Sequence, residues 1–295
     1  MKNYEVINKI KGVMAYPPTP FKKDGTVDFK GLKKHLNFLE ENKVHIIAPA
    51  GGTGEFFSLT LEEWKEVIST TVETINESLI LPAVGKSVEE AKEMARFAEN
   101  LGCKVIQIMP PHSMFGNRID GIFEYNKEIA GSVSIGVIPY NLEGSMSIGL
   151  VDRLMTIENV VAIKDESGDI QWFRKVIERY PDLIGICATA EMFAPYYFLA
   201  GASAFSSGIV NFLPQVSLSV YHAIIEKRYD DVFVLQKNLR GLIELRSKSG
   251  RHIPVVKEAL NLMGFSESIV RPPLCLLTDS EREILKNIMK EFNII

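Results

Sequence analysis

The sequence alternates between short apolar segments and longer segments with helical periodicity, and this rhythm constrains the fold more than any other feature. Eight apolar segments of strand length lie between residues 12 and 206. Eight strand–helix units in one chain are typical of a (β/α)8 barrel, or TIM barrel, of the α/β class. We expect its strands at Gly12–Tyr16, His45–Ala50, Leu79–Val84, Val105–Met109, Ile135–Tyr140, Val160–Lys164, Leu183–Cys187 and Ala202–Ser206.

The segments between these strands support the same interpretation. Helical periodicity covers Phe29–Glu41, Leu61–Ile75, Val88–Leu101 and Val151–Ile157. A doubly wound open sheet is the alternative, but it would place a glycine-rich turn after its first strand. In this chain Pro17–Phe21, Pro-Pro-Thr-Pro-Phe, follows the first strand. The barrel is therefore favoured.

The strand pattern stops after Lys227, and helical patterns alone follow it. Three of them cover Asp231–Arg246, Ile253–Met263 and Ser280–Phe292. We therefore expect a catalytic barrel over residues 1–227 and a C-terminal helical appendage over residues 228–295.

Composition limits the partners of the chain. The 295 residues carry a formal net charge of −4, and a surface of this sign repels nucleic acid and anionic membranes. No segment reaches the roughly 18 apolar residues of a membrane helix. Three cysteines lie far apart, without metal or disulfide spacing. We expect a cytoplasmic protein with neither a nucleic-acid nor a membrane partner.

Polar residues follow six of the predicted strands. The carboxyl ends of barrel strands form the rim on which barrel enzymes place their chemistry. Lys164 ends the apolar run Val160–Ile163, where removal from water would lower the pKa of its amine and leave it able to form a Schiff base. The alternative is a lysine that flanks a strand and reaches solvent. The other rim residues are Thr19, Gly51–Leu59, Pro110, Pro111, His112, Tyr140, Asn141 and Ser206–Gly208.

Two further rim features have a chemical and a structural interpretation. The loop Gly51–Gly54 can offer successive backbone N–H groups to a carboxylate, although a tight turn would also use glycines. Tyr140 can transfer protons during Schiff-base chemistry, although a tyrosine at a strand end can simply cap the core.

The remaining titratable residues are less informative. The five histidines show no metal-ligand spacing. Of these, His112 falls on the rim, and His35 is expected on a helix surface. The acidic residues Asp165, Glu166 and Asp169 could suggest a cation site. The favoured interpretation is that they begin the next helix, where negative charge suits the helix dipole.

The Gly51–Glu55 loop, the tyrosine that ends the fifth strand and the lysine that ends the sixth resemble the dihydrodipicolinate synthase and N-acetylneuraminate lyase superfamily. The resemblance covers nearly the whole chain. It implies a (β/α)8 barrel, Lys164 as the Schiff-base lysine, Tyr140 as a proton relay and a homo-oligomer, a tetramer or dimer. Dihydrodipicolinate synthases carry threonine where Gly52 stands and a carboxylate-binding arginine where Ser145 stands. They also carry a relay tyrosine that Pro111–Ser113 lacks.

Within this superfamily the chain looks most similar to the 5-dehydro-4-deoxyglucarate dehydratases. The similarity rests on Ala50–Thr60, Lys164–Asp165, Gly168–Ile170, Thr189–Glu191, Ser206–Ser207 and Asn211–Phe212. Two positions differ from these dehydratases. Glu143 stands where a basic residue would be expected, and Glu166–Ser167 stand where small residues are common.

The resemblance implies decarboxylating dehydration of 5-dehydro-4-deoxyglucarate to 2,5-dioxopentanoate, with the lysine iminium as electron sink and without metal or cofactor. The substrate, a keto sugar acid, would contact Thr19, Gly52, Thr53, Gly54, Ser206 and Ser207. Three alternatives stay open. They are retro-aldol cleavage of a 2-keto-3-deoxy sugar acid, condensation of pyruvate with an aldehyde, and a keto-acid-binding protein without catalysis.

Overall fold

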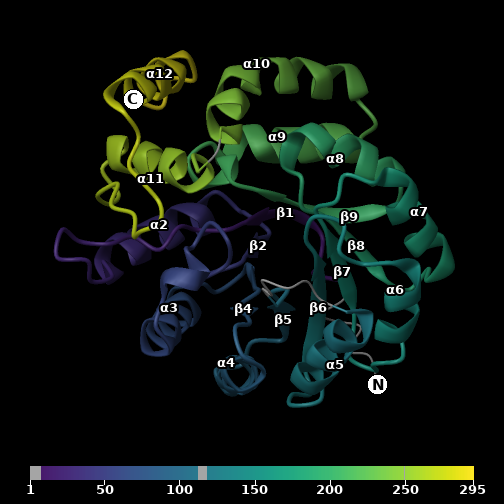
Figure 1. The fold of residues 1–295 in the computed structure, drawn as a ribbon. Coiled ribbons are helices and arrows are strands. Elements are labelled where there is room, and N and C mark those ends of the chain that lie inside the picture. Colours follow the sequence, from purple (N-terminus) through teal and green to yellow (C-terminus); the bar gives the residue numbers. More distant parts are fainter. Residues whose placement is uncertain (1–7, 112–117, 249) are drawn as a thin grey trace.

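The computed structural model describes residues 8–111, 118–248 and 250–295, and it confirms the barrel. Parallel strands form a sheet in the order β3-β2-β1-β9-β8-β7-β6-β5-β4, with helices around it (Figure 1). All eight predicted strand positions are occupied. The strands are β1 Gly12–Ala15, β2 Ile46–Ile47, β3 Leu79–Ile80, β4 Ala83–Val84, β5 Val105–Ile108, β6 Gly136–Asn141, β7 Ala162–Asp165, β8 Ile184–Cys187 and β9 Ala202–Ser207.

The third barrel strand is split in two, and it closes the sheet. β3 and β4 are consecutive in the chain but stand at opposite ends of the strand order. Leu81 donates a backbone hydrogen bond to Ile47 on one side (2.8 Å), and the Pro82 carbonyl accepts one from Gln107 on the other (2.9 Å). Pro82 has no N–H to donate. The run from Leu79 to Val84 therefore joins both edges into a barrel.

A helix follows each barrel strand. Several begin at Ser, Thr or Asp caps; Thr60, for example, forms a capping box with Glu63. The predicted helix Val151–Ile157 instead begins at Ile148, because Ser147 caps it. The barrel helices are α2 Phe29–Glu41, α3 Leu61–Thr74, α4 Val88–Asn100, α5 Ile119–Ala130, α6 Ile148–Leu154, α7 Ile170–Arg179, α8 Ala190–Leu199 and α9 Pro214–Ile225, with short 3-10 helices η1 Phe56–Ser58 and η2 Ile209–Asn211.

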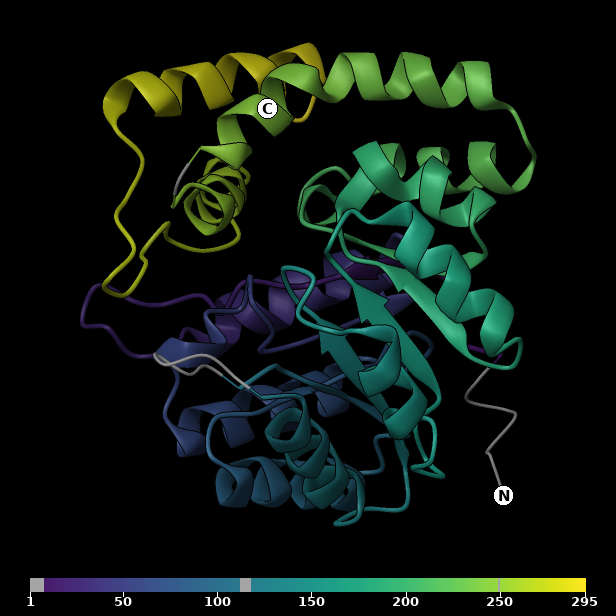
Figure 2. The ribbon, with the colours of Figure 1, turned by 45° about the vertical axis from the view of Figure 1, so that its right-hand side comes forward.

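The three predicted C-terminal helices are present as α10 Tyr229–Ser247, α11 His252–Leu262 and α12 Asp279–Glu291. They gather on one side of the barrel, where α10 runs beside α8 and α9 (Figures 1 and 2). Their apolar faces share one core with Ile209, Phe212 and Leu213 at the end of the barrel. No helix in the described part of the chain is long and apolar enough to cross a membrane.

The inside of the barrel is filled by apolar side chains that alternate along the strands. Met14, Val105, Ile138, Ala162 and Ala204 belong to this inner cluster. Side chains along a strand alternate with a period of two, so the residue two positions later faces the same way. Two positions after these five residues, and therefore facing the inside of the barrel, are Tyr16, Gln107, Tyr140, Lys164 and Ser206.

One surface prediction is wrong. His35 lies on α2 but is 2% exposed, and its Nε2 is 2.9 Å from the carbonyl oxygen of Asn211. Burial lowers the pKa of His35 to about 4. The periodicity of α2 places His35 next to Leu32, Leu36 and Leu39, and the contact with the η2 segment requires the tertiary fold.

Candidate active site

A cavity of about 630 Å³ opens at the carboxyl ends of the strands. Six of the eight residues that the sequence predicts to act on or bind the substrate line this cavity. They are Lys164, Tyr140, Gly52, Thr53, Ser206 and Ser207. The remaining walls come from other strand ends and from the C-terminal helices. These residues include Tyr16, Gln107, Glu166, Thr189, Glu191, Gly208, Arg246 and His252.

Lys164 lies at the centre of this arrangement and is 4% exposed. It stands opposite Tyr140 in the β6–β7 register. Its Nζ is 3.5 Å from the centroid of the Tyr140 ring and 4.8 Å from that of Tyr16. Within the described residues it makes no ion pair and no hydrogen bond. The amine is therefore held between two aromatic faces rather than by a carboxylate.

The neighbouring carboxylate is occupied elsewhere. Asp165 faces the outside of the barrel, because it follows Lys164 by one residue on the same strand. It accepts hydrogen bonds from Asn141 (2.6 Å), the Ser167 hydroxyl (2.9 Å) and Tyr197. Asp165 thus fixes β7 against β6 and α8 without pairing with the lysine.

The burial of Lys164 has a chemical consequence. Desolvation lowers the pKa of its amine to about 7, against opposing contributions from Cys187 and Asp165. An amine with this pKa is substantially neutral near pH 7, and a neutral amine can attack a ketone. A buried amine of this kind is what the first step of Schiff-base chemistry requires.

The loop that follows β2 presents its backbone to the same cavity. Gly52 and Thr53 line the cavity, and in the described part of the chain their N–H groups donate no hydrogen bond. A Cβ on Gly51 would lie 2.4 Å from the Tyr16 ring, whereas a Cβ on Gly52 would meet nothing within 4 Å. Packing thus requires glycine at 51, whereas a side chain at 52 would extend into open space.

Two predicted contact residues lie behind this loop. The Thr19 hydroxyl donates to the Gly54 carbonyl at 2.7 Å, and neither residue lines the cavity. They hold the loop in this structure, and their contact with substrate stays a prediction.

The serines at the end of β9 differ from one another. Ser206 lines the cavity and donates to the Ala188 carbonyl at 3.1 Å. Ser207 also lines it, but its hydroxyl donates to Glu191 and accepts from the Val210 N–H at 2.9 Å. Ser206 is therefore freer to meet a ligand than Ser207.

Tyr16, Gln107 and Glu166 are among the cavity residues that the sequence prediction did not place there. Tyr16 donates from its hydroxyl to Gln107, and both could have been found from the period of two along β1 and β5. Asp165 and Glu166 were expected to begin a helix together with Asp169, and this is wrong for both: Asp165 ends β7 and Glu166 lines the cavity, whereas Asp169 caps α7. Burial raises the pKa of Glu166 to about 7, so an acid–base group lines the same cavity as Lys164.

Two predicted features lie at the edge of this region. Ser145 and Glu143 line a neighbouring cavity of about 740 Å³ together with Tyr140. His112 lies outside the described residues. In the described part of the chain no cluster of His, Cys, Asp and Glu could hold a metal ion.

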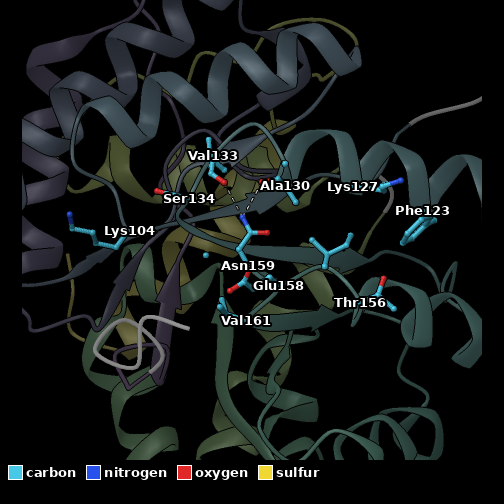
Figure 3. Close-up of a pocket in the computed structure, with 13 residues that line it drawn as sticks. Lys104, Phe123, Lys127, Ala130, Val133, Ser134, Thr156, Glu158, Asn159 and Val161 are labelled. Atoms are coloured by element: carbon cyan, nitrogen blue, oxygen red, sulfur yellow. Dashed lines mark hydrogen bonds between the residues drawn. The ribbon is translucent and has the colours of Figure 1, made fainter. Parts of the chain in front are cut away.

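Another cavity lies at the opposite end of the barrel, at the amino ends of β5, β6 and β7 (Figure 3). Its central polar side chain, Asn159, donates to the carbonyls of Ala130 (3.0 Å), Val133 (3.3 Å) and Ile135 (3.0 Å). The Asn159 amide therefore ties together the connection between α5 and β6. The end of a barrel opposite the rim serves stability rather than chemistry.

Comparison with known proteins identifies a family and a set of relatives that match nearly the whole chain. The family model described as "Dihydrodipicolinate synthetase family" matches residues 9–292. The "Probable 5-dehydro-4-deoxyglucarate dehydratase" of Pseudomonas putida (strain W619) is 33% identical over 291 residues, 94% of each chain. The protein of the same name from Acinetobacter baumannii (strain AB307-0294) is 33% identical over 285 residues, 93% of each chain.

Solved structures show the same architecture. The dihydrodipicolinate synthase from Oceanobacillus iheyensis superposes with a TM-score of 0.93 at 28% identity, covering 99% of both chains. The enzyme from Bacillus clausii also gives 0.93, at 27% identity, covering 98% of this chain and 99% of the other.

Proposed function

The chain belongs to the dihydrodipicolinate synthetase family, and we propose that it is a Schiff-base lyase that converts 5-dehydro-4-deoxyglucarate to 2,5-dioxopentanoate, water and carbon dioxide. The observation that carries this proposal is the buried, unpaired Lys164 in the cavity formed by the strand ends. The curated relatives named as probable dehydratases of this sugar acid support the choice of reaction.

The proposed reaction begins at the lysine. The neutral Lys164 amine attacks the ketone, and loss of water from the carbinolamine gives an iminium. Tyr140, whose ring contacts the amine, exchanges protons with the carbinolamine. The N–H groups of Gly52 and Thr53, with the Ser206 hydroxyl, bind the carboxylate beside the ketone.

The iminium then acts as the electron sink. A proton leaves the adjacent methylene, the β-hydroxyl departs as water, and decarboxylation follows. Hydrolysis of the Schiff base returns Lys164 and releases 2,5-dioxopentanoate. One water consumed in hydrolysis balances the one released on iminium formation, so the net products are one water and one carbon dioxide.

Two residues support dehydration over dihydrodipicolinate synthesis. Ser145 stands where the synthases carry a carboxylate-binding arginine, and a hydroxyl cannot replace a charged bidentate contact. Gly52 replaces a threonine in the loop. Purified enzyme should release carbon dioxide from 5-dehydro-4-deoxyglucarate and give negligible product from pyruvate and aspartate semialdehyde. Dihydrodipicolinate formation at a comparable rate would overturn this choice.

Glu166 supports a second candidate reaction. A carboxyl of pKa about 7 in the cavity could accept the proton of a substrate hydroxyl, as retro-aldol cleavage requires. Pyruvate release from a 2-keto-3-deoxy sugar acid without carbon dioxide would favour this reaction over dehydration.

We also propose that the chain self-associates, as the resemblance implies. The neighbouring helices α8 and α10 expose Phe193, Tyr196, Leu199, Phe233 and Val234, each at least 42% accessible. Sedimentation velocity of the purified protein tests this, and a monomer at micromolar concentration would contradict it.

A further inference from the structure

Arg246 brings a positive charge from the C-terminal helices into the wall of the cavity. It lies near the end of α10 and lines the cavity that contains Lys164. Ile243 and Ser247 of α10 and His252 and Ile253 of α11 line this wall too, and most of the other lining residues come from strand ends and the segments that follow them. The arginine thus belongs to the site in space although it lies beyond the barrel in the sequence.

The guanidinium of Arg246 has no protein partner in the described part of the chain. No hydrogen bond or ion pair involves it, and its Nε is buried and unpaired. By contrast, Arg251, Arg271 and Arg282 of the same C-terminal region each pair with a glutamate. Buried polar groups normally have partners, so an unpaired guanidinium on a cavity wall indicates a ligand that supplies the acceptor.

Gly208 provides the room for this side chain. A Cβ at position 208 would lie 2.0 Å from Nη2 of Arg246 and 2.7 Å from its Cζ. The φ of Gly208 is −84°, which any residue can adopt. Backbone conformation therefore does not require glycine here, whereas the position of the guanidinium does.

Glu191 is the acidic neighbour that could give Arg246 a purely structural role. Its charge raises the pKa of Arg246, although burial, the larger cause, lowers it. One oxygen of Glu191 accepts hydrogen bonds from Ser207 and from Ser217, the latter at 2.6 Å. The two serines hold only this oxygen, and the other carboxylate oxygen of Glu191 is buried without a hydrogen-bond partner. Neither oxygen is within ion-pair distance of Arg246 in the described part of the chain.

We propose that Arg246 binds the distal carboxylate of a dicarboxylic 2-keto acid whose keto carbon is attached to Lys164. This inference rests on the proposed Schiff-base function. The carboxylate beside the ketone would lie on the Gly52–Thr53 N–H groups, and the distal one would reach the guanidinium, which suits bidentate carboxylate binding. The positive charge that Ser145 does not supply would then come from α10.

A matched pair of keto acids tests this assignment. 2-Oxoadipate and 2-oxohexanoate have the same chain length and differ by a carboxylate in place of the terminal methyl group. Each would be incubated with the enzyme and borohydride, and the Lys164 adduct quantified by peptide mass mapping against ligand concentration. The wild-type protein should reach half-maximal labelling at a lower concentration of 2-oxoadipate.

Arg246→Gln should raise the half-maximal concentration of 2-oxoadipate by about tenfold or more, since a charged hydrogen-bond pair is lost. Labelling by 2-oxohexanoate should change by less than about twofold, since its methyl end makes no such pair. Arg240→Gln is the matched control, because Arg240 is an exposed arginine on the same helix. Gly208→Ala should reproduce the selective loss by displacing the guanidinium.

The outcomes separate this inference from the proposed function. No Lys164 adduct with either acid in the wild-type protein would refute the Schiff-base function itself. Normal labelling with an unchanged preference in Arg246→Gln would overturn only the role of Arg246. Equal loss of both adducts in Arg246→Gln would show that Arg246 has a structural role beside the Glu191 carboxylate and does not bind the ligand. This too would overturn the proposal.

Discussion

Lys164 and Lys257 are both almost completely buried, at 4% and 1% exposed, yet their surroundings differ. Lys257, on α11, forms an ion pair with Glu55 and donates to the Ile269 carbonyl at 2.7 Å. Lys164 lies against two tyrosine rings without a carboxylate partner. Burial lowers the pKa of Lys257 to about 8 against the opposing effect of Glu55, and that of Lys164 to about 7.

The pair at Lys257 connects the C-terminal helices to the candidate active site. Glu55 ends the Gly51–Gly54 loop in a left-handed conformation, with φ of 56°. Its second oxygen accepts from the Arg271 N–H at 3.0 Å. One buried lysine thus holds the loop that faces the cavity, and the other remains free to react. We infer from this difference that the absence of a charged partner, rather than burial alone, distinguishes the proposed nucleophile.

The largest effect should come from Lys164→Arg. A guanidinium stays protonated and cannot form a Schiff base, so turnover should fall to the background of the assay. Lys257→Arg keeps a cation beside Glu55 and should retain measurable turnover. Turnover by Lys164→Arg above the background would remove the distinction between the two lysines.

Tyr140→Phe should have the next largest effect. It keeps the ring beside Lys164 and removes the proton-transferring hydroxyl, so kcat should fall by about 10²–10⁴-fold. The affinity for a substrate analogue should change little. A nearly normal kcat would show that the ring, rather than the phenol, is what the site needs.

Replacing Lys257 or Lys164 by methionine should change the free energy of unfolding in opposite directions. Lys257→Met leaves Glu55 buried and unpaired and should lower the free energy of unfolding by about 3–5 kcal/mol. Adding Glu55→Gln to this variant removes the unpaired charge and should restore part of the lost free energy of unfolding. Lys164→Met removes an unpaired buried amine and should raise that free energy by about 1–4 kcal/mol at pH 7. Denaturant unfolding measures both, and destabilisation by Lys164→Met would contradict the account.

The pH dependence of that gain has a definite sign. The pKa of Lys164 is about 7 in the folded protein and near 10.5 when unfolded. Between these values the unfolded chain binds the additional proton, so this group makes stability rise with pH across that window. The difference in free energy of unfolding between Lys164→Met and the wild-type protein should therefore shrink from pH 7 towards pH 10.

The smallest effect concerns the rate of adduct formation. Below pH 7 the neutral fraction of Lys164 falls, so the rate of pyruvate labelling should fall by about tenfold per pH unit. Glu166 also has a pKa of about 7, so the profile should be repeated in Glu166→Gln. If the fall in labelling rate below pH 7 persists in Glu166→Gln, it is due to Lys164. If the fall disappears, it is due to Glu166.

Sequence periodicity was sufficient for the barrel and for much of the cavity. Because strand ends meet at one rim, Lys164, Tyr140 and Gly52 could be placed together from their order along the chain. Arg246 could not, because its position depends on how α10 packs against the barrel. Glu166 was misplaced because an acidic residue before a helix usually serves its amino end, whereas the turn here directs it into the cavity.

Borohydride trapping with pyruvate, followed by peptide mapping of both lysines, tests the central claim most directly. Both amines are buried, and the pKa of each is lowered, so Lys257 serves as an internal control within the same sample. The account predicts a covalent adduct on Lys164 and none on Lys257. An adduct on Lys257 or another lysine, with Lys164 unmodified, would contradict it.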